Sequence, residues 1–265
     1  MQALRSLFIW ICIATITSSM YFVGLPMFIV TAAFDPLRAI GHRYATYWGR
    51  MMFHLNARWS CSVVHPERVP KKRALVVVSN HEGVADIMVT YHLDLHFKWI
   101  SKASNFFVPF MGWFMFHAGY IPLRRGKGGS IRTAMARARD YLDRGVSVLF
   151  FAEGTRSLDG VVKPFKPGAF KLAIAGQFDI LPIAIAGSAN AIPKHSWKFS
   201  EERTPMKLVV GEVISTKGLV DADLAALTER SRSAVIELKA EGDALIDREL
   251  GREAPQHAPR PAPAT

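Results

Sequence analysis

The stretch Ala74-Leu-Val-Val-Val-Ser-Asn-His-Glu-Gly-Val-Ala-Asp86 indicates both the fold of the chain and the position of its chemistry. Its first five residues are all apolar, which is typical of a β-strand that helices cover on both faces. The polar residues Asn80 and His81 follow almost at once, so they would lie just beyond the carboxyl end of that strand. In open α/β sheets this is the edge where ligands bind.

Predicted strands alternate with predicted helices along the rest of the chain. A second apolar run, 146–151, leads into Glu153-Gly-Thr-Arg156 and places another polar cluster after a buried strand. The pattern predicts an α/β fold with a mostly parallel central sheet flanked by helices. The expected strands are 58–65, 74–79, 97–101, 119–123, 146–151, 180–186 and 206–214, and the expected helices are 84–95, 130–144, 168–177 and 221–250.

The N-terminal region is unusually apolar. Residues 7–34 form 28 consecutive positions without a formal charge, more than the roughly 20 that cross a bilayer. Gly24 and Pro26 interrupt the run, so a kinked span and a re-entrant hairpin of two shorter helices are both open. A secretory signal peptide is disfavoured, because its apolar core is only about 7 to 15 residues. We predict an N-terminal hydrophobic membrane-associated helical region (1–57), an α/β domain (58–250) and a disordered tail (251–265).

Charge and cysteine content narrow the class of protein. Lys and Arg outnumber Asp and Glu by 33 to 22, and the formal charge of +11 suits an anionic surface or substrate. No nucleic-acid recognition motif accompanies this charge, so nucleic acid is not an expected partner. The two cysteines, Cys12 and Cys61, indicate neither a disulfide framework nor a cysteine-based zinc site.

His81 and Asp86 have the spacing of a base and the residue that orients it. Gly83 allows the loop between them to turn, and Asp86 is suitably placed to begin the next helix. His81 would take a proton from a substrate hydroxyl, while Asp86 holds the imidazole tautomer and stabilises the imidazolium. This chemistry needs no nucleophile from the enzyme. A structural histidine and a simple helix cap are the alternative when the pair is taken alone.

The second cluster has the residue types of an anion site. Arg156 offers a planar fork of donors matched to phosphate, Gly154 permits close approach of the backbone, and Thr155 donates through its hydroxyl. Glu153 accepts bonds from a hydroxyl or holds a neighbouring arginine. Two further basic groups, 119–125 and 163–171, would add cations at the same sheet edge.

Taken together and in order, these clusters resemble the four-block signature of the glycerolipid acyltransferases, particularly the bacterial 1-acyl-sn-glycerol-3-phosphate acyltransferases. The blocks are Asn80-His81-x4-Asp86, Gly119 to Arg125, Phe151-Ala-Glu-Gly-Thr-Arg-Ser157 and Leu181-Pro-Ile183. The joint match is specific, whereas any one block is weak.

The resemblance implies an acyl transfer. His81 would act as general base on the sn-2 hydroxyl of lysophosphatidic acid, which attacks the thioester of acyl-CoA or acyl carrier protein to give phosphatidic acid. Asp86 matches the partner of the histidine, and no metal or tightly held cofactor is needed. The expected substrate-binding residues are Asn80, Arg125, Glu153, Gly154, Thr155, Arg156, Lys166 and Gly168.

The same resemblance, with the basic and aromatic residues that follow the apolar run, implies a bacterial inner-membrane protein whose catalytic domain faces the cytoplasm. The sequence departs from the family pattern at two positions that bear on the identity of the acceptor. Ala152 stands where the family usually has proline, and Arg124 where an aspartate is frequent. Other lysophospholipids and lyso-aminolipids therefore stay open as acceptors.

Other enzyme classes fit less well. His81-Glu82 begins like a zinc-protease motif, but the second histidine is replaced by Ala85. A Walker loop before Lys127 fails because Ile121 replaces its first glycine, and the chain has no Gly-x-Ser-x-Gly elbow. A membrane lipid-binding protein without turnover is the non-enzymatic alternative, and the presence of a base, its partner and the cations argues against it.

Overall fold

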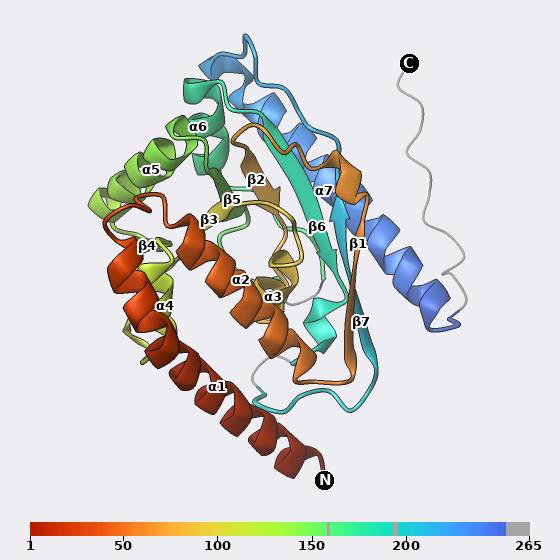
Figure 1. The fold of residues 1–265 in the computed structure, drawn as a ribbon. Helices are drawn as coiled ribbons and strands as arrows, with labels where there is room; N and C mark the ends of the chain where they lie inside the picture. The colour runs from red at the N-terminus through yellow and green to blue at the C-terminus, as the bar shows by residue number, and fades with distance from the viewer. Residues whose placement is uncertain (158–159, 193–195, 253–265) are drawn as a thin grey trace.

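A seven-stranded sheet forms the centre of the protein in a computed structural model that describes residues 1–157, 160–192 and 196–252 (Figure 1). The strand order is β1-β7-β6-β2-β5-β3-β4, and every neighbouring pair is parallel except β6 with β7. The predicted α/β class with a mostly parallel sheet is therefore confirmed. The strands are β1 (Trp59–Val64), β2 (Val76–Ser79), β3 (Phe97–Lys102), β4 (Ile121–Leu123), β5 (Ser147–Phe151), β6 (Ile180–Ala186) and β7 (Thr204–Val210).

Helices cover both faces of this sheet (Figure 1). One layer contains α1 (Gln2–Thr31), α2 (Ala39–His54), α3 (Asp86–Thr90) and α4 (Met111–His117). The other contains α5 (Gly128–Asp143), α6 (Gly168–Gly176) and α7 (Leu224–Glu249). Short 3₁₀ helices complete the described part: η1 (Pro66–Arg68), η2 (Ala103–Phe107), η3 (Ser188–Asn190) and η4 (Asp221–Asp223).

The apolar run that precedes Asn80 and His81 is buried on both faces. Leu75 and Val77 point into the core beneath α1 to α4, while Val76 and Val78 point into the core beneath α5 to α7. All four side chains are fully buried. Side chains alternate between the two faces of a strand, so only a continuous apolar run fills both cores.

The apolar N-terminal segment folds as one continuous helix, α1, which passes through Gly24 and Pro26 without a break. The hairpin of two shorter helices, left open by the sequence, is thus not what the structure contains. Within the described residues, α1 alone is long and apolar enough to cross a membrane, judged by length and composition.

Contacts with the α/β domain run along the whole length of α1. Arg5 donates to the Phe199 carbonyl (3.2 Å) near the amino end of the helix. Farther along, the Trp48 indole of α2 donates to Thr17 Oγ1 (3.0 Å). Near the carboxyl end, the Phe28 ring stacks on His117 of α4, with ring centroids 4.8 Å apart. The helix therefore lies against the domain rather than projecting from it.

A buried lysine ties the turn between α1 and α2 to the sheet. Lys98 of β3 is fully buried, and its Nζ donates to the carbonyls of Arg38 (3.0 Å) and Ala118 (2.7 Å). Burial lowers the pKa of this lysine to about 7. The Asp35 carboxylate fixes the same turn, because it accepts the N–H groups of Ala39 and Ile40, both at 2.8 Å.

Several element boundaries differ from those predicted. The helix expected over 84–95 ends at Thr90, where Arg50 of α2 binds the next carbonyl, that of Tyr91, at 2.9 Å. The strand expected over 206–214 ends at Val210, and Ile214 pairs separately with Ile180. Helix α4 was not predicted. The division at 57/58 stays a prediction, and the tail 251–265 lies outside the described residues apart from its first two positions.

Candidate active site

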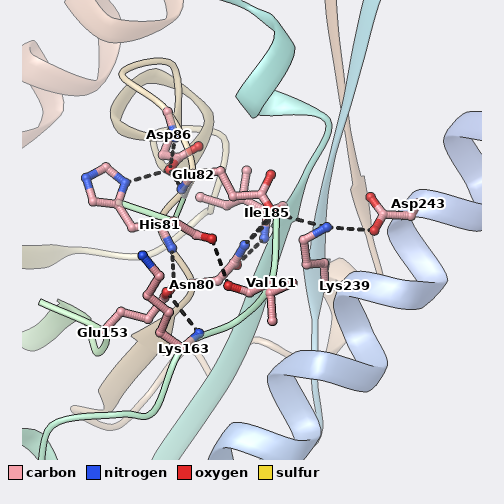
Figure 2. Close-up of polar contacts among 12 residues, drawn as sticks. Asn80, His81, Glu82, Asp86, Glu153, Val161, Lys163, Ile185, Lys239 and Asp243 are labelled. Atoms are coloured by element: carbon pink, nitrogen blue, oxygen red, sulfur yellow. Dashed lines mark hydrogen bonds and ion pairs between the residues drawn. The ribbon is translucent and has the colours of Figure 1, made fainter. Parts of the chain in front are cut away.

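The loop after β2 brings His81 and Asp86 into contact. Nδ1 of His81 lies 2.6 Å from Oδ2 of Asp86, the residue that begins α3 (Figure 2). The same oxygen accepts the backbone N–H groups of Glu82 (2.7 Å) and Gly83 (3.0 Å). Asp86 is fully buried, whereas the His81 side chain is 17% exposed. Nε2 is therefore the imidazole nitrogen left for a substrate.

Residues of the third block hold the backbone of His81 from both sides. Its N–H donates to Glu153 Oε1 (2.9 Å), and its carbonyl accepts the N–H of Ser157 (2.7 Å). The imidazole also stacks on Phe151, with ring centroids 4.1 Å apart and planes 21° apart. Sequence reasoning assigned Phe151 no role, because an aromatic at a strand end is ordinarily part of the core.

Glu153 organises this loop with both of its oxygens. Besides the bond from His81, Oε2 accepts the Lys163 N–H at 3.1 Å. The residue is buried, which raises the pKa of its carboxyl group, and the two N–H donors act in the opposite direction. Its expected contact with the acceptor stays a prediction.

Asn80 joins the carboxyl ends of two strands. Its side-chain amide donates to the Ile185 carbonyl and accepts the Ile185 N–H, both at 2.8 Å. The side chain is buried, so it extends the pairing of β2 with β6 beyond the last residue of β2. A direct contact of Asn80 with substrate stays a prediction.

A cavity of about 550 Å³ opens beside His81. Four other predicted site residues line it: Arg125, Gly154, Lys166 and Gly168. Asp86, Asn80 and Glu153 lie behind this lining and support it. Thr155 and Arg156 are exposed on the same loop as Gly154 but outside the lining.

Gly154 makes room for a cation at the mouth of the cavity. Its φ is +70°, and an added Cβ would lie 2.8 Å from Cε of Lys166. A side chain here would be strained and would displace the lysine. At the start of the same loop, the Ala152 N–H donates to the Ser79 carbonyl at 3.1 Å. A proline in place of Ala152 has no N–H with which to make that bond.

The deeper part of the cavity is apolar. Its walls come from α2, α3, β3, α4 and the end of β5, so helices of the N-terminal layer shape the site together with the sheet. The main wall residues are Trp48, Ile87, Tyr91, Trp99, Phe114, Met115, Tyr120 and Phe150. We call this part the apolar chamber. A cavity lined by an apolar chamber, a cationic mouth and a paired imidazole suits a ligand with a hydrocarbon chain and an anionic group.

Residues 60–186 match the family model described as acyltransferase. Over these residues the chain belongs to the acyltransferase family. This confirms the family that the four sequence blocks indicate. The matched segment begins in β1 and ends with β6, so it contains loop 80–86, Arg125 and the third block.

Relatives and a solved structure agree with this family. A 1-acyl-sn-glycerol-3-phosphate acyltransferase of Chlamydomonas reinhardtii is 33% identical over 199 residues, covering 69% of this chain and 59% of the relative. A chloroplastic enzyme of the same name from Arabidopsis thaliana is 33% identical over 185 residues, which cover 69% of this chain and 51% of that relative. The chain thus spans between half and three fifths of these two relatives.

The crystal structure of the 1-acyl-sn-glycerophosphate acyltransferase from Thermotoga maritima superposes with a TM-score of 0.63 at 26% sequence identity. The superposition covers 91% of this chain and 98% of that one. The two chains therefore share a fold over most of their length.

Proposed function

We propose that this chain transfers a fatty acyl group from acyl-CoA or acyl carrier protein to the sn-2 hydroxyl of lysophosphatidic acid. The product is phosphatidic acid, an intermediate of phospholipid biosynthesis. The observation that carries the proposal is the place of His81: its Nδ1 is held by Asp86 at 2.6 Å, and its ring borders a cavity with an apolar chamber and a cationic mouth. The relatives named above supply the substrate class.

The proposed step is a direct transfer. Nε2 of His81 takes the proton of the substrate hydroxyl as its oxygen attacks the thioester carbonyl carbon. The C–S bond then breaks, and the leaving thiol takes the proton from the imidazolium. Asp86 stabilises that imidazolium between the two proton transfers. The proposed chemistry uses no metal and no tightly bound cofactor.

The cavity suggests how the two substrates are arranged. The acyl chain occupies the apolar chamber, where its burial is favourable by about 0.8 kcal/mol per methylene. Arg125 and Lys166 at the mouth bind the acceptor phosphate, since charged donors form the strongest hydrogen bonds to phosphate oxygens. Arg156, exposed on the same loop as Gly154, extends this cationic surface, and the hydroxyl of Thr155 adds a neutral donor.

The acceptor assignment predicts a specific loss of affinity. Arg125→Ala and Lys166→Met should each raise KM for lysophosphatidic acid roughly 10- to 100-fold and leave kcat within a few-fold, because each removes a charged hydrogen bond of about 1.5 to 3 kcal/mol. Initial rates with lysophosphatidic acid, lysophosphatidylcholine and a lyso-aminolipid measure this. Acyl-CoA and acyl carrier protein thioesters are offered separately.

Lys217→Met is the control, since Lys217 lies near Gln177 and the start of β6, at the opposite edge of the sheet. Its KM should equal that of the unmodified protein. Faster turnover of lysophosphatidylcholine than of lysophosphatidic acid would contradict the proposed acceptor.

We also place the protein on the bacterial inner membrane, with the catalytic domain facing the cytoplasm. Large apolar side chains are exposed on α1, although the helix packs against the domain along its length, so we propose that α1 lies along the membrane surface. The exposed set is Leu4, Leu7, Phe8, Ile11, Phe22, Val23, Ile29 and Val30.

Polar substitution of α1 should release the protein from lipid. The triple variant Leu7→Ser/Phe8→Ser/Ile11→Ser should bind vesicles of phosphatidylcholine and phosphatidylglycerol at least about 100-fold more weakly, because each buried apolar side chain contributes about 1.5 to 3 kcal/mol. Flotation with vesicles measures the bound fraction. Val220→Ser, an equally exposed apolar residue far from α1 in the sequence, should float as before. Equal flotation of the triple variant would contradict this orientation.

A further inference from the structure

Glu82 lies between the two proposed catalytic residues in the sequence, but its side chain points away from the His81 imidazole and toward Lys239 (Figure 2). It is not part of the cavity lining. Its side chain is 3% exposed and lies 3.1 Å from Nζ of Lys239. The amide of Asn80 is a second, longer contact at 3.4 Å. A buried carboxylate is costly unless it is paired, so the position of this side chain depends on its cation.

Lys239 comes from α7, beyond the segment that matches the family model. Its Nζ also lies 2.7 Å from Asp243 one turn later, and its side chain is 14% exposed. Helix α7 packs against β6 and β7, and it reaches loop 80–86 through this lysine and Glu82. Elsewhere on α7, Arg232 donates to the carbonyls of Lys163 (3.3 Å) and Val162 (2.9 Å). Nothing in the proposed chemistry uses Lys239.

A chain of contacts leads from this lysine to the base. Lys239 holds the Glu82 carboxylate, and the Glu82 backbone N–H donates to Oδ2 of Asp86 at 2.7 Å. That oxygen also meets Nδ1 of His81 at 2.6 Å. A shift of Glu82 would therefore alter the position of the oxygen that orients the imidazole.

We infer that Lys239 is a positioning residue: by pairing with Glu82 it fixes loop 80–86 so that Nε2 of His81 faces the cavity. Its effect on turnover rests on the proposed function. Helix α7 thus completes the active site from outside the matched segment, with one ion pair on the side of the loop opposite the substrate.

A second ion pair of α7 provides a matched control. Lys207 of β7 lies 2.6 Å from Glu249 near the end of α7, and its side chain is 13% exposed, almost the same as Lys239. This pair also joins α7 to the sheet but, among the described contacts, has none with loop 80–86. A general contribution of α7 packing would affect both lysines alike.

Steady-state kinetics with the full chain test the inference. Lys239→Met should lower kcat roughly 10- to 100-fold, the loss expected when a catalytic group is misplaced by about 1 Å, with little change in either KM. Lys239→Arg should restore most of the rate. The double variant Glu82→Gln/Lys239→Met should have a higher kcat than Lys239→Met alone, because the double variant leaves no unpaired buried carboxylate. Lys207→Met should stay within about twofold of the unmodified protein.

The Nδ1 proton of His81 gives a readout that does not depend on turnover. Its low-field NMR signal should shift or broaden in Lys239→Met and stay in place in Lys207→Met. An unchanged signal with unchanged kcat in Lys239→Met, or equal losses in both lysine variants, would overturn the inference. Absence of acyl transfer by the unmodified protein would refute the proposed function instead, and the NMR comparison would still decide the role of Lys239.

Discussion

Replacing His81 with alanine is expected to lower kcat for acyl transfer roughly 100- to 10,000-fold, the contribution of a positioned general base. The hydroxyl of the acceptor then has no group to take its proton. KM for lysophosphatidic acid should change little, since the cations at the cavity mouth remain. Quantifying phosphatidic acid by mass spectrometry measures the rate, and equilibrium binding of the lysolipid measures retained affinity.

His65→Ala is the matched control for this variant. The His65 imidazole also meets a carboxylate, that of Glu241, at 2.9 Å, but it lies just after β1 and does not line the cavity. Turnover of this variant should equal that of the unmodified protein. Turnover retained by His81→Ala would refute the mechanism even if the protein binds lysolipid normally.

The second large effect is expected for Asp86→Asn. Oδ2 of Asp86 accepts three hydrogen bonds, and a neutral amide oxygen neither holds the imidazole tautomer as firmly nor stabilises the imidazolium. In serine-protease triads the corresponding change lowers kcat about 10,000-fold, and a loss of roughly 100- to 10,000-fold is expected here. Stopped-time assays at saturating substrates give kcat directly.

Asp179→Asn serves as the comparison, because Asp179 likewise accepts a backbone N–H, that of Thr216 at 3.1 Å, and pairs with Arg73. It precedes β6, at the edge of the sheet opposite the cavity. This variant should lose stability but keep kcat per folded molecule. A similar drop in kcat for both variants would indicate that Asp86 acts only in folding.

Much of the sheet could be predicted because its strands carry their signal locally. Continuous apolar runs such as 74–78 and 180–186 fill cores on both faces, and β6 occupies the predicted range. Helix α4 (Met111–His117) carries no comparable signal. It is rich in aromatic residues, and its pattern does not distinguish a helix at the cavity wall from a strand.

The candidate site was predictable in part. The spacing of His81 and Asp86 places them in one short loop, so their contact follows from local geometry. Arg156 and Thr155 have suitable chemistry, but sequence does not give the direction of a side chain, and both lie outside the cavity lining. Lys239 is 157 residues beyond Glu82, and a single lysine on an amphipathic helix gives no sign of such a partner.

Following a labelled acyl group tests the central claim most directly. The purified full chain is mixed with vesicles containing lysophosphatidic acid and with a thioester that carries a ¹⁴C-acyl chain. Direct transfer predicts that the label appears in phosphatidic acid, esterified at the sn-2 position, with one thiol released for each ester formed and no label bound to the protein. Release of the label as free fatty acid, or no transfer from either thioester to any lysolipid, would contradict it.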